Sequence, residues 1–346
     1  MSSSQSAISY LYGAAAFVIV VAGCKLAAPL IAPILLATFL AIIFSPLLLK
    51  LRSWRVPTII ALPLLAVPVI ALMTLLGLML QTSFVSLHHN RAEYELEIEK
   101  RKKETVALLN RTGLDVSDEI SLGNLEPEQV EEWAKGAFTV FSGVVAYAFL
   151  VIMLLIIMLL QATGMAEKYA ETDEPANSAI GRAKRILIDV RHYLVLKTWI
   201  SLMTGAATYL LLLFFEVDFP VLWAFLAFLL NYIPNIGSVL AAIPPVILSF
   251  IMDGGGTAFG VAMGYLVINV LVGNIIEPLW MGKGVGLSPL AVILSLLFWS
   301  WVLGPVGAVL SVPLTMTIKI VLESDDATSR FAGLLGPIKA EATAEA

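Results

Sequence analysis

The side chains of this chain that could do chemistry are amides, a tyrosine and a carboxylate placed inside long apolar runs. The densest group is the segment NYIPNIGS at 231–238, which holds Asn231, Tyr232, Pro234, Asn235 and Gly237. Pro234 removes a backbone donor and clashes with the carbonyl four residues back, and Gly237 adds backbone freedom. Carbonyl groups here can leave the helical ladder and, with the amides, bind a substrate or an ion. The alternative is a structural kink held by two interhelical asparagine hydrogen bonds.

A second group lies further along the chain and consists of Asn269, Asn274, Glu277 and Pro278. Asn274 and Glu277 are three positions apart, so on an α-helix they share a face. At the bilayer surface Glu277 would be an ordinary carboxylate at the end of a span. Between helices it would be a proton or cation acceptor, because desolvation disfavours the charged form. Lys283 is its nearby candidate partner, and Glu277 is the candidate for ion coupling.

The composition shows which solvent surrounds the helices that carry these polar side chains. Of 346 residues, 59% are hydrophobic and 14% are charged, and the mean hydropathy is +0.91. Soluble domains carry about 25% charged residues, and a globule of this length could not bury so much apolar surface. Lipid is therefore the solvent for most of the chain. This excludes an ordinary soluble enzyme and a disordered protein.

Several kinds of site are excluded by residue types that the sequence lacks. One cysteine and three histidines form no metal-ligand pattern, and a net charge of −5 leaves no basic stripe for nucleic acid. The sequence contains no Walker-type phosphate loop and no evident Ser/His/Asp set. We therefore expect no metal, no cofactor, no nucleic-acid partner and no enzymatic activity.

Charge-free runs predict the spans, because a Lys, Arg or Asp at the centre of a span costs about 2.5–3.5 kcal/mol. The runs are 1–24, 26–49, 56–87, 136–160, 198–215, 219–252, 254–276 and 284–318. The fold class is therefore all-α, a polytopic integral membrane helix bundle of about eight transmembrane helices. The runs 219–252 and 284–318 are too long for one span and contain several Pro and Gly residues. We expect broken or re-entrant segments there.

The basic residues predict the orientation and, with it, the layout. Twelve Lys and Arg residues, Lys197 among them, fall on one side, and only Lys25 and Lys283 fall on the other outside the insertion 88–135. By the positive-inside rule both termini are then cytoplasmic. The parts are transmembrane helices 1–3 (1–87), an extracytoplasmic helical insertion (88–135), helix 4 (136–160), a cytoplasmic amphipathic connector (161–197), a transmembrane transport core (198–322) and a cytoplasmic tail (323–346).

Two of these parts lie outside the spans. In the insertion, the i,i+4 pairs Glu97/Arg101 and Glu99/Lys103 favour a helix. The insertion is either a solvated hairpin that shields the bundle or an intersubunit or substrate-vestibule element. In the connector, Ile180, Leu187 and Leu194 are spaced by seven, which predicts an amphipathic helix lying along the membrane before the fifth span.

Five segments make the chain resemble the bacterial autoinducer-2 exporter family. They are HYLVLKT (192–198), NYIPNIG (231–237), GNIIEP (273–278), MGKGVGLS (281–288) and FWSWVLGPVG (298–307). The resemblance covers nearly the whole chain in layout and is most specific from about 190 to 322. In the N-terminal third it rests on hydropathy and on WRVP at 54–57, and the Glu/Lys-rich stretch 91–104 is less typical. The family motifs carried over to this sequence are Asn231, Pro234, Asn235, Gly237, Asn274, Glu277, Pro278, Gly282, Gly286 and Pro305.

The resemblance implies a multi-pass protein of the bacterial inner membrane that exports a small signalling molecule, autoinducer-2 above all, by a secondary or facilitated mechanism. It also implies a homo-oligomer, with a pentamer as one candidate. The asparagine amides suit a hydroxyl-rich ligand, because they both donate and accept hydrogen bonds. One alternative is a sodium/proton antiporter with Glu277 as the exchanging carboxylate. A second is a membrane scaffold or receptor that does not transport.

Overall fold

The computed structural model describes residues 2–67, 146–161, 178–281, 286–324 and 328–336, with isolated helical positions between 70 and 143. Every regular element in these ranges is a helix, which confirms the all-α class. Most of the insertion 88–135, the first part of the connector, Gly282, Lys283 and the end of the tail lie outside the described residues. Within the insertion, the predicted i,i+4 pair of Glu99 and Lys103 is present at 2.8 Å.

The N-terminal part begins with two long apolar helices, α1 (Ser2–Leu26) and α2 (Ala28–Ser53). They coincide with the first two predicted runs, and the chain turns between them at Ala27. Two shorter apolar helices follow, Thr58–Val67 and Ala146–Gln161. Large apolar side chains on α1, such as Phe17 and Ile19, are mostly exposed. Such a surface suits contact with lipid.

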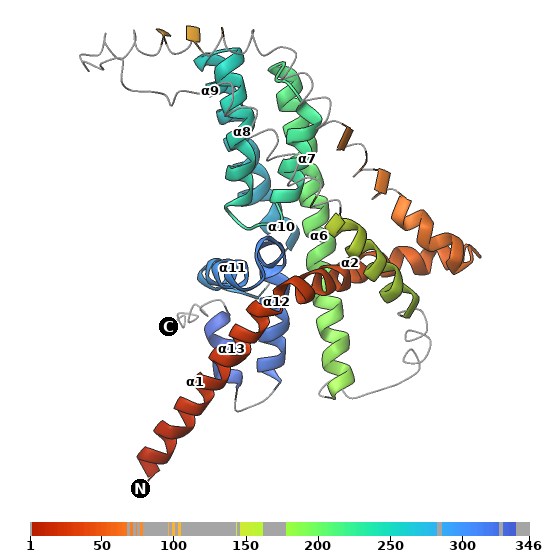
Figure 1. The fold of residues 1–346 in the computed structure, drawn as a ribbon, viewed down its shortest axis with the longest axis vertical. Helices are drawn as coiled ribbons and strands as arrows, with labels where there is room; N and C mark the ends of the chain where they lie inside the picture. The colour runs from red at the N-terminus through yellow and green to blue at the C-terminus, as the bar shows by residue number, and fades with distance from the viewer. Residues whose placement is uncertain are drawn as a thin grey trace, which may run out of the picture.

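The helix α6 (Ala179–Phe214) is the central column of the described structure, as Figure 1 shows. Its first turn is capped by Ser178, whose side chain accepts a hydrogen bond from the Gly181 amide at 3.0 Å. The expected boundary between connector and span at 197/198 is not a break, because one helix runs through it. At 1.5 Å per residue, 36 residues measure about 54 Å, so the helix is longer than a hydrocarbon core of about 30 Å.

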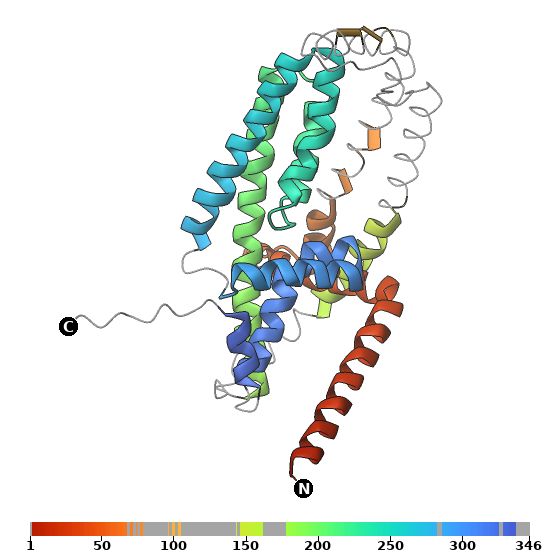
Figure 2. The ribbon, with the colours of Figure 1, turned by 90° about the vertical axis from the view of Figure 1, so that its left-hand side faces the viewer.

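The run 219–252 forms a helical hairpin. In this hairpin α7 (Pro220–Leu230) descends beside α6, the chain turns at 231–236, and α8 (Gly237–Met252) returns to the same end (Figure 2). The helices measure about 16 and 24 Å, each too short to cross the core alone. The tip therefore stops midway along α6. The run is therefore broken, which agrees with the expectation of a broken or re-entrant segment.

The remaining helices run from this hairpin to the C-terminal end. α9 (Gly255–Ile268) passes directly into a π-helical segment, η1 (Asn269–Ile276), and then into α10 (Glu277–Met281). The run 284–318 is also broken, into α11 (Pro289–Leu303) and α12 (Pro305–Glu323), with Gly304 between them at φ +68°. In Figure 2, α11 crosses the long axis of α6. A short helix, α13 (Ser329–Leu335), follows.

Four helices in the described part are long and apolar enough to cross a membrane: Ala28–Ser53, Ile180–Phe214, Gly255–Met281 and Pro305–Glu323. The other apolar helical stretches there have 10–17 residues, among them Tyr12–Leu26 within α1. Since much of 68–145 lies outside the described residues, the count of eight spans stays a prediction. The class of multi-pass helical membrane protein is confirmed.

Candidate functional site

A buried ion pair joins α6 to the start of α10. The ammonium nitrogen of Lys197 lies 2.7 and 2.9 Å from the two carboxylate oxygens of Glu277. The Lys197 side chain is 4% exposed and that of Glu277 is 23% exposed. Ionised side chains are rarely held in such an apolar setting without a partner, and at membrane depth they mark functional sites.

The partner of Glu277 differs from the sequence-based expectation. Lys283, the expected partner, lies outside the described residues. Lys197, which the charge pattern assigns to the cytoplasmic connector, is instead buried in the middle of α6. Its charge does not force it to the membrane surface, because a carboxylate from another part of the chain neutralises it.

The tip of the α7–α8 hairpin is bonded to α6 directly above this ion pair. Tyr232 donates a hydrogen bond from its hydroxyl to Thr198 Oγ1 at 2.7 Å. Asn231 donates from Nδ2 to Ser201 Oγ at 3.0 Å. Two predicted residues of the tip therefore contact α6, Tyr232 at the residue next to Lys197 and Asn231 one turn further along the face that carries Lys197.

A further polar contact connects the hairpin to the π-helix. Ser238, in the first turn of α8, donates from its hydroxyl to Asn269 Oδ1 at 2.9 Å. The π-helix itself is a signal of function, because such segments are uncommon and are frequently found at functional sites. Asn269 and Glu277 stand at the first residue of the π-helix and directly after its last.

The other predicted residues shape the tip or lie outside it. Asn235 is exposed and adopts a left-handed conformation with φ 61°, which asparagine tolerates better than most residues. Pro234 is in the turn, and Gly237 is buried where α8 starts. Asn274 and Pro278 are exposed. Asn274 lies within the π-helix, three positions before Glu277, and their sharing of a face stays a prediction.

Sequence reasoning missed a buried polar stripe on α6. Its members are Tyr193, Lys197, Ser201, Thr204 and Thr208, all buried. Their spacing of three and four places them on one helix face, which contacts α10 at Lys197 and the hairpin tip at Ser201. The signal was available in the sequence, because small hydroxyl residues recur at this spacing within the apolar run 198–215. We refer to these five residues as the α6 stripe.

The upper end of the α6 stripe holds hydroxyl groups without partners. Thr208 Oγ1 and the Tyr265 hydroxyl are buried and have no hydrogen-bond partner among the described residues. Gly260 of α9 lies against the side chain of Phe215, and Gly264 lies against that of Leu211, so neither position has room for a Cβ. Because residue numbers rise along α9 while those of their neighbours on α6 fall, the two helices run antiparallel in a fixed register. That register sets Tyr265 within one turn of Thr208. Buried hydroxyls are normally satisfied, so this level of the stripe is suited to water or a hydroxyl-bearing ligand.

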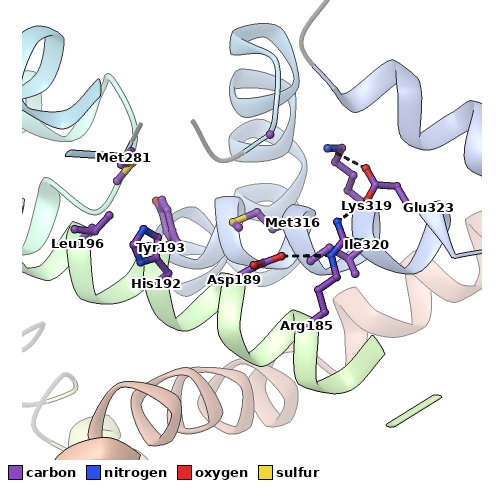
Figure 3. A pocket seen from close by; sticks show the side chains of 11 residues that line it. Arg185, Asp189, His192, Tyr193, Leu196, Met281, Met316, Lys319, Ile320 and Glu323 are labelled. Atoms are coloured by element: carbon purple, nitrogen blue, oxygen red, sulfur yellow. Dashed lines mark ion pairs between the residues drawn. The ribbon is translucent and has the colours of Figure 1, made fainter. Parts of the chain in front are cut away.

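The lower end of the α6 stripe opens on a cavity of about 280 Å³ between α6 and α12 (Figure 3). Tyr193 belongs both to the stripe and to the cavity wall. Charged side chains from both helices complete the wall, among them Arg185, Asp189, Lys319 and Glu323. The cavity, the ion pair and the bonded tip thus lie in order along one face of α6.

This combination defines a class: a multi-pass helical membrane protein with a helical hairpin that turns midway along its central helix and with charged and hydroxyl groups buried between its helices. The chain belongs to the AI-2E family of transporters, whose family model matches residues 14–324. It is 40% identical over 335 residues to a putative transport protein of Haemophilus influenzae, covering 95% of this chain and 96% of that protein. It is 39% identical over 324 residues to the AI-2 transport protein TqsA of Escherichia coli K12, covering 94% of each. The putative transport protein YhhT of Escherichia coli K12 is 36% identical over 323 residues, covering 93% of each.

Proposed function

We propose that the chain is a secondary transporter or facilitator that exports a small, hydroxyl-rich signalling molecule of the autoinducer-2 type. The observation that carries this proposal is the buried Lys197–Glu277 pair beside a hairpin tip that ends midway along α6. A relative with 39% identity is named for transport of AI-2, which supports the choice of cargo.

The chemistry of the α6 stripe suits such a cargo. Ser201, Thr198 and Tyr232 present hydroxyls that both donate and accept, and Asn231 presents an amide that does the same. The tip is tied to α6 by two neutral hydrogen bonds, one to Ser201 of the stripe and one to Thr198 beside it, each worth about 0.5–1.5 kcal/mol net. A ligand hydroxyl can replace either bond at small cost, so the tip can separate from α6 while the cargo passes.

A second candidate function is exchange of sodium for protons at Glu277. The carboxylate is bound to a buried ammonium group at 2.7 Å, and a proton or a sodium ion on the carboxylate would release Lys197 from it. This release of Lys197 from Glu277 would then couple ion flow to a movement of the hairpin tip. This candidate shares the ion pair with the first and differs in the cargo.

Flux through proteoliposomes separates the two. Purified protein is reconstituted, and efflux of autoinducer-2 is measured beside sodium-dependent pH change, each with and without an imposed gradient. Autoinducer-2 flux that exceeds the flux through protein-free vesicles supports the first proposal. A sodium-dependent pH response that Glu277→Gln removes, without autoinducer-2 flux, supports the second. The absence of both would favour a scaffold or receptor and contradict both transport proposals.

The placement in the cell is part of the proposal. We place the chain in the bacterial inner membrane with both termini in the cytoplasm, supported by the basic residues near the lower end of α6, such as Arg182, Arg185 and Arg191. We also propose a homo-oligomer, on the strength of the family resemblance. Cysteine-accessibility labelling in intact cells tests the first point, and native mass spectrometry tests the second.

The unpaired hydroxyl of Thr208 gives a prediction that separates stability from transport. Thr208→Val removes a buried hydroxyl without a partner, so we expect the free energy of unfolding to stay the same or to rise by about 1 kcal/mol. We expect flux to fall, because the upper stripe loses a polar group. Thermal unfolding in detergent and flux in proteoliposomes measure the two effects.

Ser201→Ala is the matched comparison on the same face. It removes the acceptor of the Asn231 Nδ2 hydrogen bond, so we expect the free energy of unfolding to fall by about 1–3 kcal/mol. If Thr208→Val keeps the flux of the native protein, the part of the α6 stripe at Thr208 does not belong to the proposed pathway.

A further inference from the structure

The cavity at the lower end of the α6 stripe has the features of a binding site. Its volume is about 280 Å³, near the lower limit of about 300 Å³ for typical small-molecule sites. Figure 3 shows that α6 supplies one wall and α12 the other, with the side chains of Tyr193 and His192 together on the α6 side. This cavity suits a compact ligand the size of a single small ring.

The charges of the cavity wall balance. Arg185 and Lys319 are cations, and Asp189 and Glu323 are anions. No single sign of charge dominates, so a strongly charged anion or cation would meet repulsion as well as attraction. The balance favours a ligand without net charge.

Arg185 is only loosely paired with the two carboxylates of the wall, whereas Lys319 Nζ lies 3.1 Å from Glu323 Oε1. Arg185 Nε lies 3.7 Å from Asp189 Oδ2, and Arg185 Nη2 lies 3.5 Å from Glu323 Oε2. Both distances exceed the ordinary N–H···O hydrogen bond of about 2.7–3.2 Å. The guanidinium donors of Arg185 and the lone pairs of Asp189 Oδ2 and Glu323 Oε2 are therefore open to a ligand hydroxyl, which donates to a carboxylate and accepts from the arginine at once.

Apolar and aromatic groups complete the wall. Tyr193 presents an aromatic ring, and Met281, Met316 and Ile320 present apolar surface. This mixture matches a molecule with hydroxyl groups on its edge and C–H groups on its faces. We infer that the cavity is a loading site for a neutral, hydroxyl-rich small molecule, held by Arg185, Asp189 and Glu323 and packed against Tyr193.

This inference deepens the proposed function, because the ligand would pass from the cavity along Tyr193 to the Lys197–Glu277 pair. Arg185 and Glu323 also form the ion pair that joins α6 to α12 across the cavity. A ligand that forms hydrogen bonds with Arg185 and Glu323 at once replaces their direct ion pair and connects α6 to α12 in its place. These residues bind the cargo and take no part in the movement of the hairpin tip.

Equilibrium dialysis of the full-length protein in lipid nanodiscs tests the site, with radiolabelled D-ribose and autoinducer-2 as the probes and inorganic phosphate as the anionic competitor. We expect saturable binding of at least one neutral probe. Arg185→Gln and Glu323→Gln should each weaken it about tenfold or more, because each removes hydrogen bonds to a charged group. Arg191→Gln, which removes one positive charge from an exposed position of α6 outside the cavity wall, should leave affinity within about twofold. Asp189→Asn serves as a further variant if either of the first two fails to fold.

The outcomes distinguish this inference from the proposed function. Neutral-probe binding that is absent, or that is unchanged by all the cavity variants, overturns the loading site, while flux of the native protein still tests transport separately. Phosphate that displaces the neutral probe at equal concentration overturns the assignment of a neutral ligand. Binding that depends on Arg185, in a protein without autoinducer-2 flux, supports the site and contradicts the proposed export.

Discussion

Replacing Lys197 with methionine is expected to lower the free energy of unfolding by roughly 3–5 kcal/mol and to abolish transport. The lysine is 4% exposed and is bonded to both oxygens of Glu277 at 2.7 and 2.9 Å. Removing one partner of a buried pair leaves the other as an uncompensated charge, and that residual charge causes most of the loss. Chemical unfolding in mixed micelles measures the first effect, and proteoliposome flux measures the second.

The matched control is Lys50→Met near the end of α2. Lys50 is an exposed lysine whose ammonium group lies 5.7 Å from the ring of Trp54. Exposed charges of this kind contribute about 0–1 kcal/mol, so the control should unfold almost as the native protein does. Equal losses in the two variants would contradict the buried pair as the cause.

A double variant separates structure from function. Lys197→Met combined with Glu277→Leu removes both charges and leaves apolar groups of similar size, which is often neutral for stability. We expect most of the unfolding free energy to return and flux to stay absent. Flux that returned together with stability would reduce the pair to a structural role and would contradict the proposed mechanism.

The breaks in the C-terminal helices could be predicted from the sequence because their causes are local. Pro234 and Gly237 disrupt the helical ladder within a few residues of their own position, and the hairpin turns where they stand. Gly304 and Pro305 act in the same way between α11 and α12. An apolar run longer than the bilayer, together with local helix breakers, was therefore enough to predict a broken or re-entrant segment.

The ion pair could not be predicted in the same way, because its two halves are 80 positions apart in the chain. Read alone, Lys197 is a charge at the end of an apolar run, and such a charge belongs at the membrane surface. Its place inside the bundle depends on Glu277, which reaches it only after the hairpin and α9 have folded back along α6.

Gly237→Ala is expected to disrupt the hairpin tip, to lower the free energy of unfolding by about 3 kcal/mol or more and to stop flux. A Cβ at this position would lie far inside the contact distance of the Leu230 carbonyl oxygen, at the end of α7. The obstructing atom is backbone, so no side-chain rotation relieves the clash. The chain must open between α7 and α8, and that movement pulls Tyr232 and Asn231 away from Thr198 and Ser201.

Gly256→Ala is the matched control for this variant, because it adds the same methyl group to α9 at a position where nothing lies within 4 Å. Alanine is also a better helix former than glycine by about 0.8–1.0 kcal/mol, so the control should be as stable as the native protein or more stable. Thermal unfolding and flux are compared in the two variants side by side. Native flux in Gly237→Ala would show that transport does not depend on the close approach of the two helices, and the tip would then lose its place in the pathway.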